Sequence, residues 1–181
     1  MVSSSRSSLL FVSGSTRKGS INSAVITTTA RLLPSSWCPT IYPGLAQLPH
    51  FNPDLEEAGP PASVTDLRSA IAATDAVLFC TPEYAGAMPG ALKNLLEWTI
   101  GDTVMSDKPV SWINPSTAPG RSAGTYATLR TVLSYTGANV VEAACCDILV
   151  ARSQVGENGV IDDPAIQEQI RAAIAALTAG R

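Results

Sequence analysis

A short apolar run that stops at a glycine-bracketed polar loop is the feature that most restricts the fold of this sequence. Residues 9–12 are Leu-Leu-Phe-Val, which has the length and composition of a strand buried on both faces, as in a parallel sheet. Gly14 and Gly19 bracket the loop that follows, and glycine permits backbone angles that are closed to other residues. From Ser20 to Leu33 the sequence is compatible with a helix, for which Ser20 is a suitable N-cap. The sequence therefore predicts a strand, a loop and a helix in direct succession.

A loop that enters a helix in this way is suited to binding an anion. The unpaired N–H groups of the first helical turn and the positive end of the helix dipole point towards whatever lies in front of them. Phosphate is the usual occupant of such a position. Arg17 adds a planar, permanently charged guanidinium, and its neighbours offer hydroxyl or amide donors. The candidate ligands are Ser15, Thr16, Arg17, Ser20 and Asn22.

Two common nucleotide-binding motifs do not match this loop. Ser20 follows Gly19 where a Walker A motif requires its lysine, and Thr16 stands where GxGxxG requires its second glycine. A phosphate monoester therefore fits the loop better than a nucleoside triphosphate or a dinucleotide. The alternative is that residues 14–20 form only a polar turn between a strand and a helix.

Strand-like and helix-like segments alternate along the rest of the chain. Strands are expected at 37–42, 76–80, 109–113 and 139–142, with 147–150 also strand-like, and helices at 64–74, 90–98, 125–135 and 164–177. This alternation predicts an open parallel sheet with helices on both faces. Ligands of such folds bind beyond the carboxyl ends of the strands, so the loops after the first, third and fourth strands should converge on one site. The proline- and glycine-rich segment 43–62 is expected to be an irregular loop.

Length and charge restrict the class of protein further. The 181 residues are most simply one domain over 8–181, preceded by a loose tail at 1–7. A net charge of -3 and the lack of any Lys/Arg cluster argue against a nucleic-acid partner. The run at 9–12 is too short for a signal peptide and no run approaches the length of a membrane span, so we expect a cytoplasmic protein without a membrane partner.

The cysteines and the single histidine do not indicate a catalytic or metal site. Cys38, Cys80, Cys145 and Cys146 lack CxxC spacing and histidine partners, which argues against zinc and thioredoxin chemistry. We interpret them as small buried hydrophobic residues, and the alternative is a redox role. His50 lies in a loop without a nucleophile or carboxylate at a recognisable spacing, so a catalytic role is not predicted.

Two loop motifs together resemble one known family. Gly14-Ser15-Thr16-Arg17-Lys18-Gly19-Ser20-Ile21-Asn22 and Thr81-Pro82-Glu83-Tyr84 resemble the NADPH-dependent FMN reductase family of flavodoxin-like proteins, which includes flavin, quinone, azo dye and chromate reductases. The continuation Pro89-Gly90-Ala91-Leu92-Lys93-Asn94 is also similar to this family. The resemblance implies an α/β, flavodoxin-like three-layer sandwich with a five-stranded parallel sheet in the order 2-1-3-4-5.

The resemblance also implies a cofactor and the residues that hold it. FMN would be held noncovalently, with its phosphate on Ser15, Arg17, Ser20, Ile21 and Asn22 and its ring edge on Pro82, Glu83, Tyr84 and Ala85. Ser116, in the loop 114–124, would be a third contact. Many relatives carry asparagine where this chain has Ala85, and the third loop lacks their double glycine. The electron donor would be NADPH or NADH, and the protein would be a homodimer or homotetramer with 82–98 at the interface.

The predicted function is the transfer of two electrons from NAD(P)H through FMN to a flavin, a quinone or a similar acceptor. No catalytic side chain is predicted, because the cofactor carries the chemistry. One alternative is a flavodoxin-type electron carrier that does not oxidise pyridine nucleotides. Another is a regulatory or scaffold protein that uses the same fold without a flavin.

Overall fold

Parallel strand pairing organises the structure, a computed structural model that describes residues 6–115 and 122–179. The strands are β1 (Ser7–Ser13), β2 (Trp37–Tyr42), β3 (Ala76–Cys80), β4 (Pro109–Asn114), β5 (Asn139–Val140) and β6 (Cys146–Asp147). They form one sheet in the order β2-β1-β3-β4-β5, and β6 also pairs with β4. All pairs are parallel, with Phe11 opposite Ile41 on one side and Leu78 on the other. The predicted order 2-1-3-4-5 is therefore confirmed.

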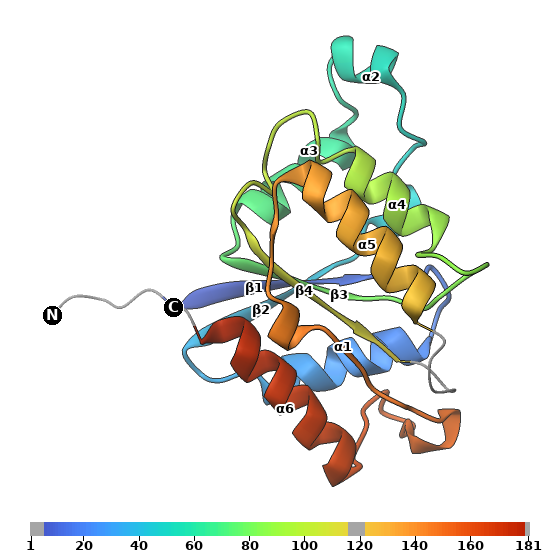
Figure 1. The fold of residues 1–181 in the computed structure, drawn as a ribbon, viewed down its shortest axis with the longest axis vertical. Coiled ribbons are helices and arrows are strands. Elements are labelled where there is room, and N and C mark those ends of the chain that lie inside the picture. Colours follow the sequence, from blue (N-terminus) through green and yellow to red (C-terminus); the bar gives the residue numbers. More distant parts are fainter. Residues whose placement is uncertain (1–5, 116–121, 180–181) are drawn as a thin grey trace, which may run out of the picture.

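Helices cover both faces of the sheet. In the view of Figure 1, α1 (Ile21–Leu32) and α6 (Pro164–Thr178) lie below it, and α3 (Ala62–Ala72), α4 (Gly90–Glu97) and α5 (Ala123–Thr136) lie above it. Alternate side chains of β1 point to opposite faces of the sheet, as the pleat of a strand requires. Leu9 and Phe11 are buried with α1 and α6, whereas Leu10 and Val12 are buried with the three helices opposite. The predicted three-layer sandwich is thus confirmed.

Local signals explain where the helices begin and end. Ser20 caps α1, since its Oγ accepts a hydrogen bond of 3.1 Å from the N–H of Ser23. Gly137 ends α5 in the left-handed conformation, with φ of +74°. Observed and predicted helix ends agree to within two residues. None of the helices within the described ranges combines the length and apolar character that crossing a membrane requires.

The fifth position of the sheet is occupied by two very short strands rather than one. A single-turn 3-10 helix, η2 (Glu142–Ala144), separates β5 from β6, and both strands pair with β4. A strand is predicted at 147–150, but the observed strand β6 covers only Cys146 and Asp147. The prediction therefore shares one residue with the structure. The interruption sends the side chain of Cys145 to the upper apolar layer and that of Cys146 to the lower one. Cys80 is fully buried, but Cys38, Cys145 and Cys146 are only half-buried, contrary to the sequence prediction.

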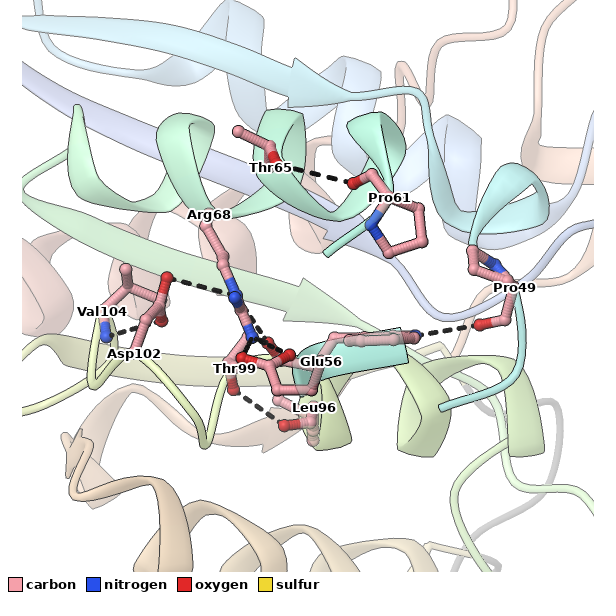
Figure 2. Close-up of polar contacts among 10 residues, drawn as sticks. Pro49, Glu56, Pro61, Thr65, Arg68, Leu96, Thr99, Asp102 and Val104 are labelled. Carbon is pink, nitrogen blue, oxygen red and sulfur yellow. Dashed lines mark hydrogen bonds and ion pairs between the residues drawn. The ribbon is translucent and has the colours of Figure 1, made fainter. Parts of the chain in front are cut away.

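The segment 43–62 is predicted to be irregular, but it contains a 3-10 turn, η1 (Leu45–Gln47), and a short projecting helix, α2 (Pro53–Glu57), and its last residue begins α3 (Figure 1). The buried guanidinium of Arg68 fastens this segment to the body of the protein (Figure 2). Arg68 Nη2 lies 2.8 Å from a carboxylate oxygen of Glu56, and Nε lies 3.1 Å from that of Asp102. The guanidinium also donates to the carbonyl oxygen of Trp98 at 2.8 and 2.9 Å. Because a buried cation needs such partners, Arg68 ties α2 and α3 to the segment after α4.

Candidate functional site

The loops after β1 and β3 meet at the carboxyl edge of the sheet. The N–H of Gly14 donates to the carbonyl oxygen of Cys80 at 2.8 Å. A Cβ on Gly14 would lie 2.4 Å from Oγ1 of Thr81, so only glycine allows this close approach. Gly14 and Thr81 are 67 residues apart in the sequence. The two loop motifs to which they belong are therefore adjacent in space.

The loop after β1 has the form expected of an anion site. Within it, Ser15 Oγ accepts a hydrogen bond of 3.3 Å from the N–H of Arg17, and Gly19 adopts φ of +60°. The helix that follows begins at Ile21, so the N–H groups of Ile21 and Asn22 have no acceptor within α1. These two donors and the helix dipole therefore remain available to an anion.

The side chains of this loop divide into two groups. Those of Thr16, Arg17 and Lys18 are exposed, and the guanidinium of Arg17 makes no hydrogen bond or ion pair with any residue in the described ranges. Ser15, Ser20 and Asn22 are buried. The Asn22 side chain lies beneath the loop, where its Oδ1 accepts a contact of 3.5 Å from the thiol of Cys80. Burial and the nearby Cys146 raise the pKa of the Cys80 thiol, which therefore stays protonated as a donor.

The loop after β3 is a tight two-residue turn. Tyr84 and Ala87 exchange backbone hydrogen bonds of 2.9 and 3.1 Å. Between them, Ala85 and Gly86 have φ values of +51° and +75°, the pattern of a type I′ turn. This turn prefers asparagine at its first central position, where this chain carries alanine. The Tyr84 side chain is 52% exposed at the edge of the turn, so it is free to contact a ligand or a second subunit.

Glu83 connects this turn to the start of α5. Its Oε2 accepts a hydrogen bond of 3.0 Å from the N–H of Thr125, in the first turn of the helix. A Cβ on Gly124 would lie 1.9 Å from the carbonyl oxygen of Gly86, so the turn and the helix are in direct backbone contact. The Glu83 carboxylate thus acts as a cap at the N-terminus of α5.

The third loop brings unpaired polar groups to the same edge. Asn114, the last residue of β4, is 1% exposed, and its Nδ2 has no hydrogen-bond partner among the described residues. The buried Oγ1 of Thr125 is likewise without a partner in the described ranges. Buried polar groups are normally satisfied, so both atoms point to a ligand with polar groups of its own. Ser116, the predicted contact in this loop, lies outside the described residues.

Asp147, which the sequence prediction missed, organises the entrance to α5. Its carboxylate accepts hydrogen bonds from Ser122 Oγ at 2.5 Å and from the hydroxyl of Tyr126 at 2.7 Å. Burial and this carboxylate raise the pKa of Tyr126. The sequence placed Asp147 at the start of the strand-like segment 147–150 rather than at the end of a strand, and its partners lie 21 and 25 residues away in the sequence.

The fold defines a flavodoxin-like α/β protein, and the loops after β1 and β3 meet at the carboxyl edge of its sheet. The model of one family, described as NADPH-dependent FMN reductase, matches residues 7–146. The chain belongs to this family, which confirms the resemblance seen in the two loop motifs.

Individual relatives agree with this assignment. The chain is 38% identical over 100 residues to a quinone reductase of Escherichia coli (strain K12), covering 54% of this chain and 53% of the relative. It is 36% identical over 122 residues to the NAD(P)H-dependent FMN reductase PA1204 of Pseudomonas aeruginosa, covering 67% of this chain and 63% of the relative. These alignments therefore span between half and two thirds of the length of the curated relatives.

A solved structure resembles nearly the whole chain. The flavoenzyme NAD(P)H:(acceptor) oxidoreductase FerB of Paracoccus denitrificans matches with a TM-score of 0.82 and 26% identity, over 94% of this chain and 97% of that one. An apo NADH:FMN oxidoreductase, EMOB, matches with a TM-score of 0.72 at 18% identity, which supports the fold alone.

The residues at the sheet edge fit FMN. A phosphate monoester suits the N–H groups of Ile21 and Asn22 and the guanidinium of Arg17, none of which is paired with another of the described residues. The polar edge of a flavin ring suits Nδ2 of Asn114 and Oγ1 of Thr125, which have no hydrogen-bond partner within 6–115 and 122–179. Donors for both ends of the cofactor are thus present at one edge of the sheet.

Proposed function

We propose that this chain is an NAD(P)H oxidoreductase that uses noncovalently bound FMN to reduce a flavin, a quinone or a similar small molecule. The observation that carries the proposal is the loop after β1, in which N–H groups and a guanidinium without a partner in the described part of the chain lie at the start of α1. Membership of the FMN reductase family supports the enzyme over the flavodoxin-type carrier.

The chain would hold the phosphate and the ring with separate loops. We assign the phosphate to Ser15, Arg17, Ser20, Ile21 and Asn22, and the ring to Pro82, Glu83, Tyr84, Ala85 and Ser116. Ser20 orients the first turn of α1, and Arg17 neutralises phosphate charge. Glu83 acts by holding the ring loop against α5 rather than as a general acid, because its carboxylate is engaged with Thr125. FMN, when bound, would supply the two-electron chemistry between NAD(P)H and the acceptor.

The proposal includes a subunit interface and a location. A cavity of about 410 Å³ lies between α4 and α5 and is lined by residues that include Met88, Lys93 and Val132. Met88 and Lys93 belong to the segment 82–98, which we propose as the interface of a homodimer or homotetramer. Light scattering at micromolar concentration tests this, and a monomer would contradict it. We place the enzyme in the cytoplasm, where NADPH and NADH are available to it.

A visible spectrum tests the proposed function. The purified protein is mixed with FMN, desalted and then treated with NADPH, or with NADH, in the absence of oxygen. Retained yellow colour that bleaches on adding the nucleotide is the expected result. Retained colour without bleaching by either nucleotide would indicate the electron carrier instead. Loss of FMN during desalting would contradict the cofactor assignment.

A further inference from the structure

We propose that Arg152 is a positioning residue for the FMN phosphate. Its guanidinium holds the end of the loop 14–20 and places a second positive charge beside it. The inference rests on the proposed function, because it assumes that FMN occupies this loop. Arg152 lies beyond residues 7–146, the part of the chain that the family model matches.

The contact itself joins distant parts of the chain. Arg152 Nη1 donates a hydrogen bond to the carbonyl oxygen of Gly19, which is 133 residues away in the sequence. Its Nη2 lies 3.9 Å from the position that a Cβ on Gly19 would occupy, so the guanidinium lies directly against this residue. Gly19 is the left-handed residue that turns the chain into α1, with φ of +60°. Arg152 therefore binds the backbone immediately before Ser20, the residue that caps α1.

The segment that carries Arg152 is itself anchored. Arg152 begins a 3-10 turn, η3 (Arg152–Gln154), and the side chain of Gln154 joins the backbone N–H of Ala151 to the carboxylate of Asp163, at 2.8 and 2.9 Å. Asp163 in turn caps α6. Further along, the N–H of Ile161 donates to the buried Oγ1 of Thr28 on α1, at 3.0 Å. In Figure 1 this segment runs beside the start of α1 before it enters α6.

This anchoring fixes the backbone that carries Arg152, whose exposed side chain is held by its contact with Gly19. A side chain whose support is already ordered loses less conformational entropy when a ligand binds. The contact with Gly19 is the one hydrogen bond that the guanidinium makes with residues in the described ranges, so its other donors remain available. It lines a cavity of about 420 Å³ together with Gly19, Ser20, Ser23 and Glu157.

Charge gives the contact its selectivity. A phosphate monoester carries about -1.5 to -2 charges at neutral pH, more than Arg17 alone can neutralise. Arg152 brings a second permanent positive charge to the same loop, in a chain whose net charge is -3. Its effect should therefore depend on the phosphate and not on the flavin ring. Riboflavin, which has the ring without the phosphate, separates the two contributions.

The test compares FMN with riboflavin. Dissociation constants for both are measured by quenching of flavin fluorescence, in the wild type and in Arg152→Ala, Arg152→Lys and Arg31→Ala. Arg31 is the matched control, since it is an exposed arginine in the last turn of α1. We expect Arg152→Ala to weaken FMN binding roughly tenfold, the loss of a charge-assisted contact, and to leave riboflavin binding unchanged. Arg152→Lys should recover part of the loss, because it keeps a charge and a donor but not the planar fork.

Each outcome has a separate meaning. Wild-type protein that binds neither flavin contradicts the proposed function itself. If the wild type binds FMN and Arg152→Ala behaves like Arg31→Ala, only the role of Arg152 is overturned. Equal losses of FMN and riboflavin in Arg152→Ala would also overturn it, since they indicate a general structural effect. A further readout is ionic strength: FMN binding to Arg152→Ala should depend less on salt than binding to the wild type.

Discussion

The carboxylate of Glu83 caps helix α5 by accepting a hydrogen bond of 3.0 Å from the backbone N–H of Thr125. This contact joins the loop after β3 to the helix that follows β4. A second hydrogen bond, of 3.2 Å from the N–H of Met88 to Oγ1 of Thr128, strengthens the same junction. The loop after β3 is therefore held against the first two turns of α5 by two hydrogen bonds.

Removal of the Glu83 cap should weaken both stability and flavin binding. We expect Glu83→Ala to lower the free energy of unfolding by about 1 kcal/mol, the usual contribution of a helix cap. Glu83→Gln should cost less, because its amide oxygen can still accept the hydrogen bond. Urea unfolding measures both variants, with Glu57→Ala, an exposed glutamate in α2, as the control. A cost in Glu83→Ala no larger than that of the control would contradict the capping role.

The turn at Ala85 should become more stable when its side chain is changed. Ala85 has φ of +51°, a conformation that costs an L-residue about 1 kcal/mol and glycine nothing. We therefore expect Ala85→Gly to raise the melting temperature, and Ala85→Asn to do so by a smaller amount. The same change at an exposed helical position, Ala175→Gly in α6, should lower it. Thermal unfolding followed by circular dichroism compares the three. A lower melting temperature in Ala85→Gly would refute the strain at this turn.

The sequence predicted the parts of the fold that depend on local pattern. The length of two apolar runs predicted β1 and β3. Ser20 predicted the start of α1 because its side chain can cap a helix, and Gly137 predicted the end of α5 because glycine adopts the left-handed conformation. The order of the strands required the family resemblance, because periodicity alone does not say which strands are neighbours.

The rest could not be predicted because it depends on contacts between distant residues. The fifth position of the sheet pairs only at 139–140 and 146–147, although residues 139–142 and 147–150 have a strand-like composition. Glu83 and Asp147 act through helix α5, and nothing in their sequence neighbourhoods reveals that partner. Arg17 was predicted by its motif, whereas Arg152 was missed because it reaches Gly19 only in the folded chain.

Arg17 should contribute directly to retaining FMN. Its guanidinium is exposed and unpaired among the described residues, so the protein without ligand does not depend on it. We expect Arg17→Ala to weaken FMN binding by one to two orders of magnitude, roughly the 1.5–3 kcal/mol of a hydrogen bond to a charged group. Its melting temperature without FMN should not change. Lys18→Ala is the neighbouring control, and fluorescence titration measures all three proteins. FMN affinity near that of the wild type in Arg17→Ala would remove Arg17 from the site.

The hydrogen bond from Tyr126 to Asp147 should give stability a dependence on alkaline pH. Burial and the carboxylate raise the pKa of Tyr126 in the folded protein above its unfolded value of about 10. The stability it contributes is therefore complete below about pH 10 and is lost as the pH rises further. We expect Tyr126→Phe to cost about 1 kcal/mol at pH 7 and progressively less above pH 10.

Urea unfolding at pH 7 and at alkaline pH checks this prediction. Tyr135→Phe is the control, because the side chain of Tyr135 is 76% exposed. Tyr42, whose pKa burial raises to about 12, is present in every variant and cancels from the comparison. A difference between Tyr126→Phe and the wild type that stays constant across the whole pH range would contradict the linkage.

Arg68 should contribute far more to stability than an exposed arginine that also forms an ion pair. The Arg68 side chain is 9% exposed. It forms ion pairs with Glu56 and Asp102 and donates a hydrogen bond to the carbonyl oxygen of Trp98 (Figure 2). Arg68→Ala leaves these acceptors without their donor, so we expect a loss of roughly 3 kcal/mol. Arg130→Ala breaks an ion pair with Glu142 in which both side chains are about half exposed, and it should cost less than about 1 kcal/mol.

Hydrogen exchange separates the local effect of Arg68 from a global one. The guanidinium fastens the segment 43–61 to the body of the protein, and the side chain of Trp98 holds the same segment through a hydrogen bond of 2.9 Å to the carbonyl oxygen of Pro49. Glu56→Gln removes one charge from the network of Arg68, Glu56 and Asp102, and we expect the protein to stay folded. We therefore expect faster exchange in α2 in this variant, with the sheet unaffected, since a weakened anchor releases only the segment it holds. Uniform acceleration across α2 and β1–β4 would show instead that the network supports the whole domain.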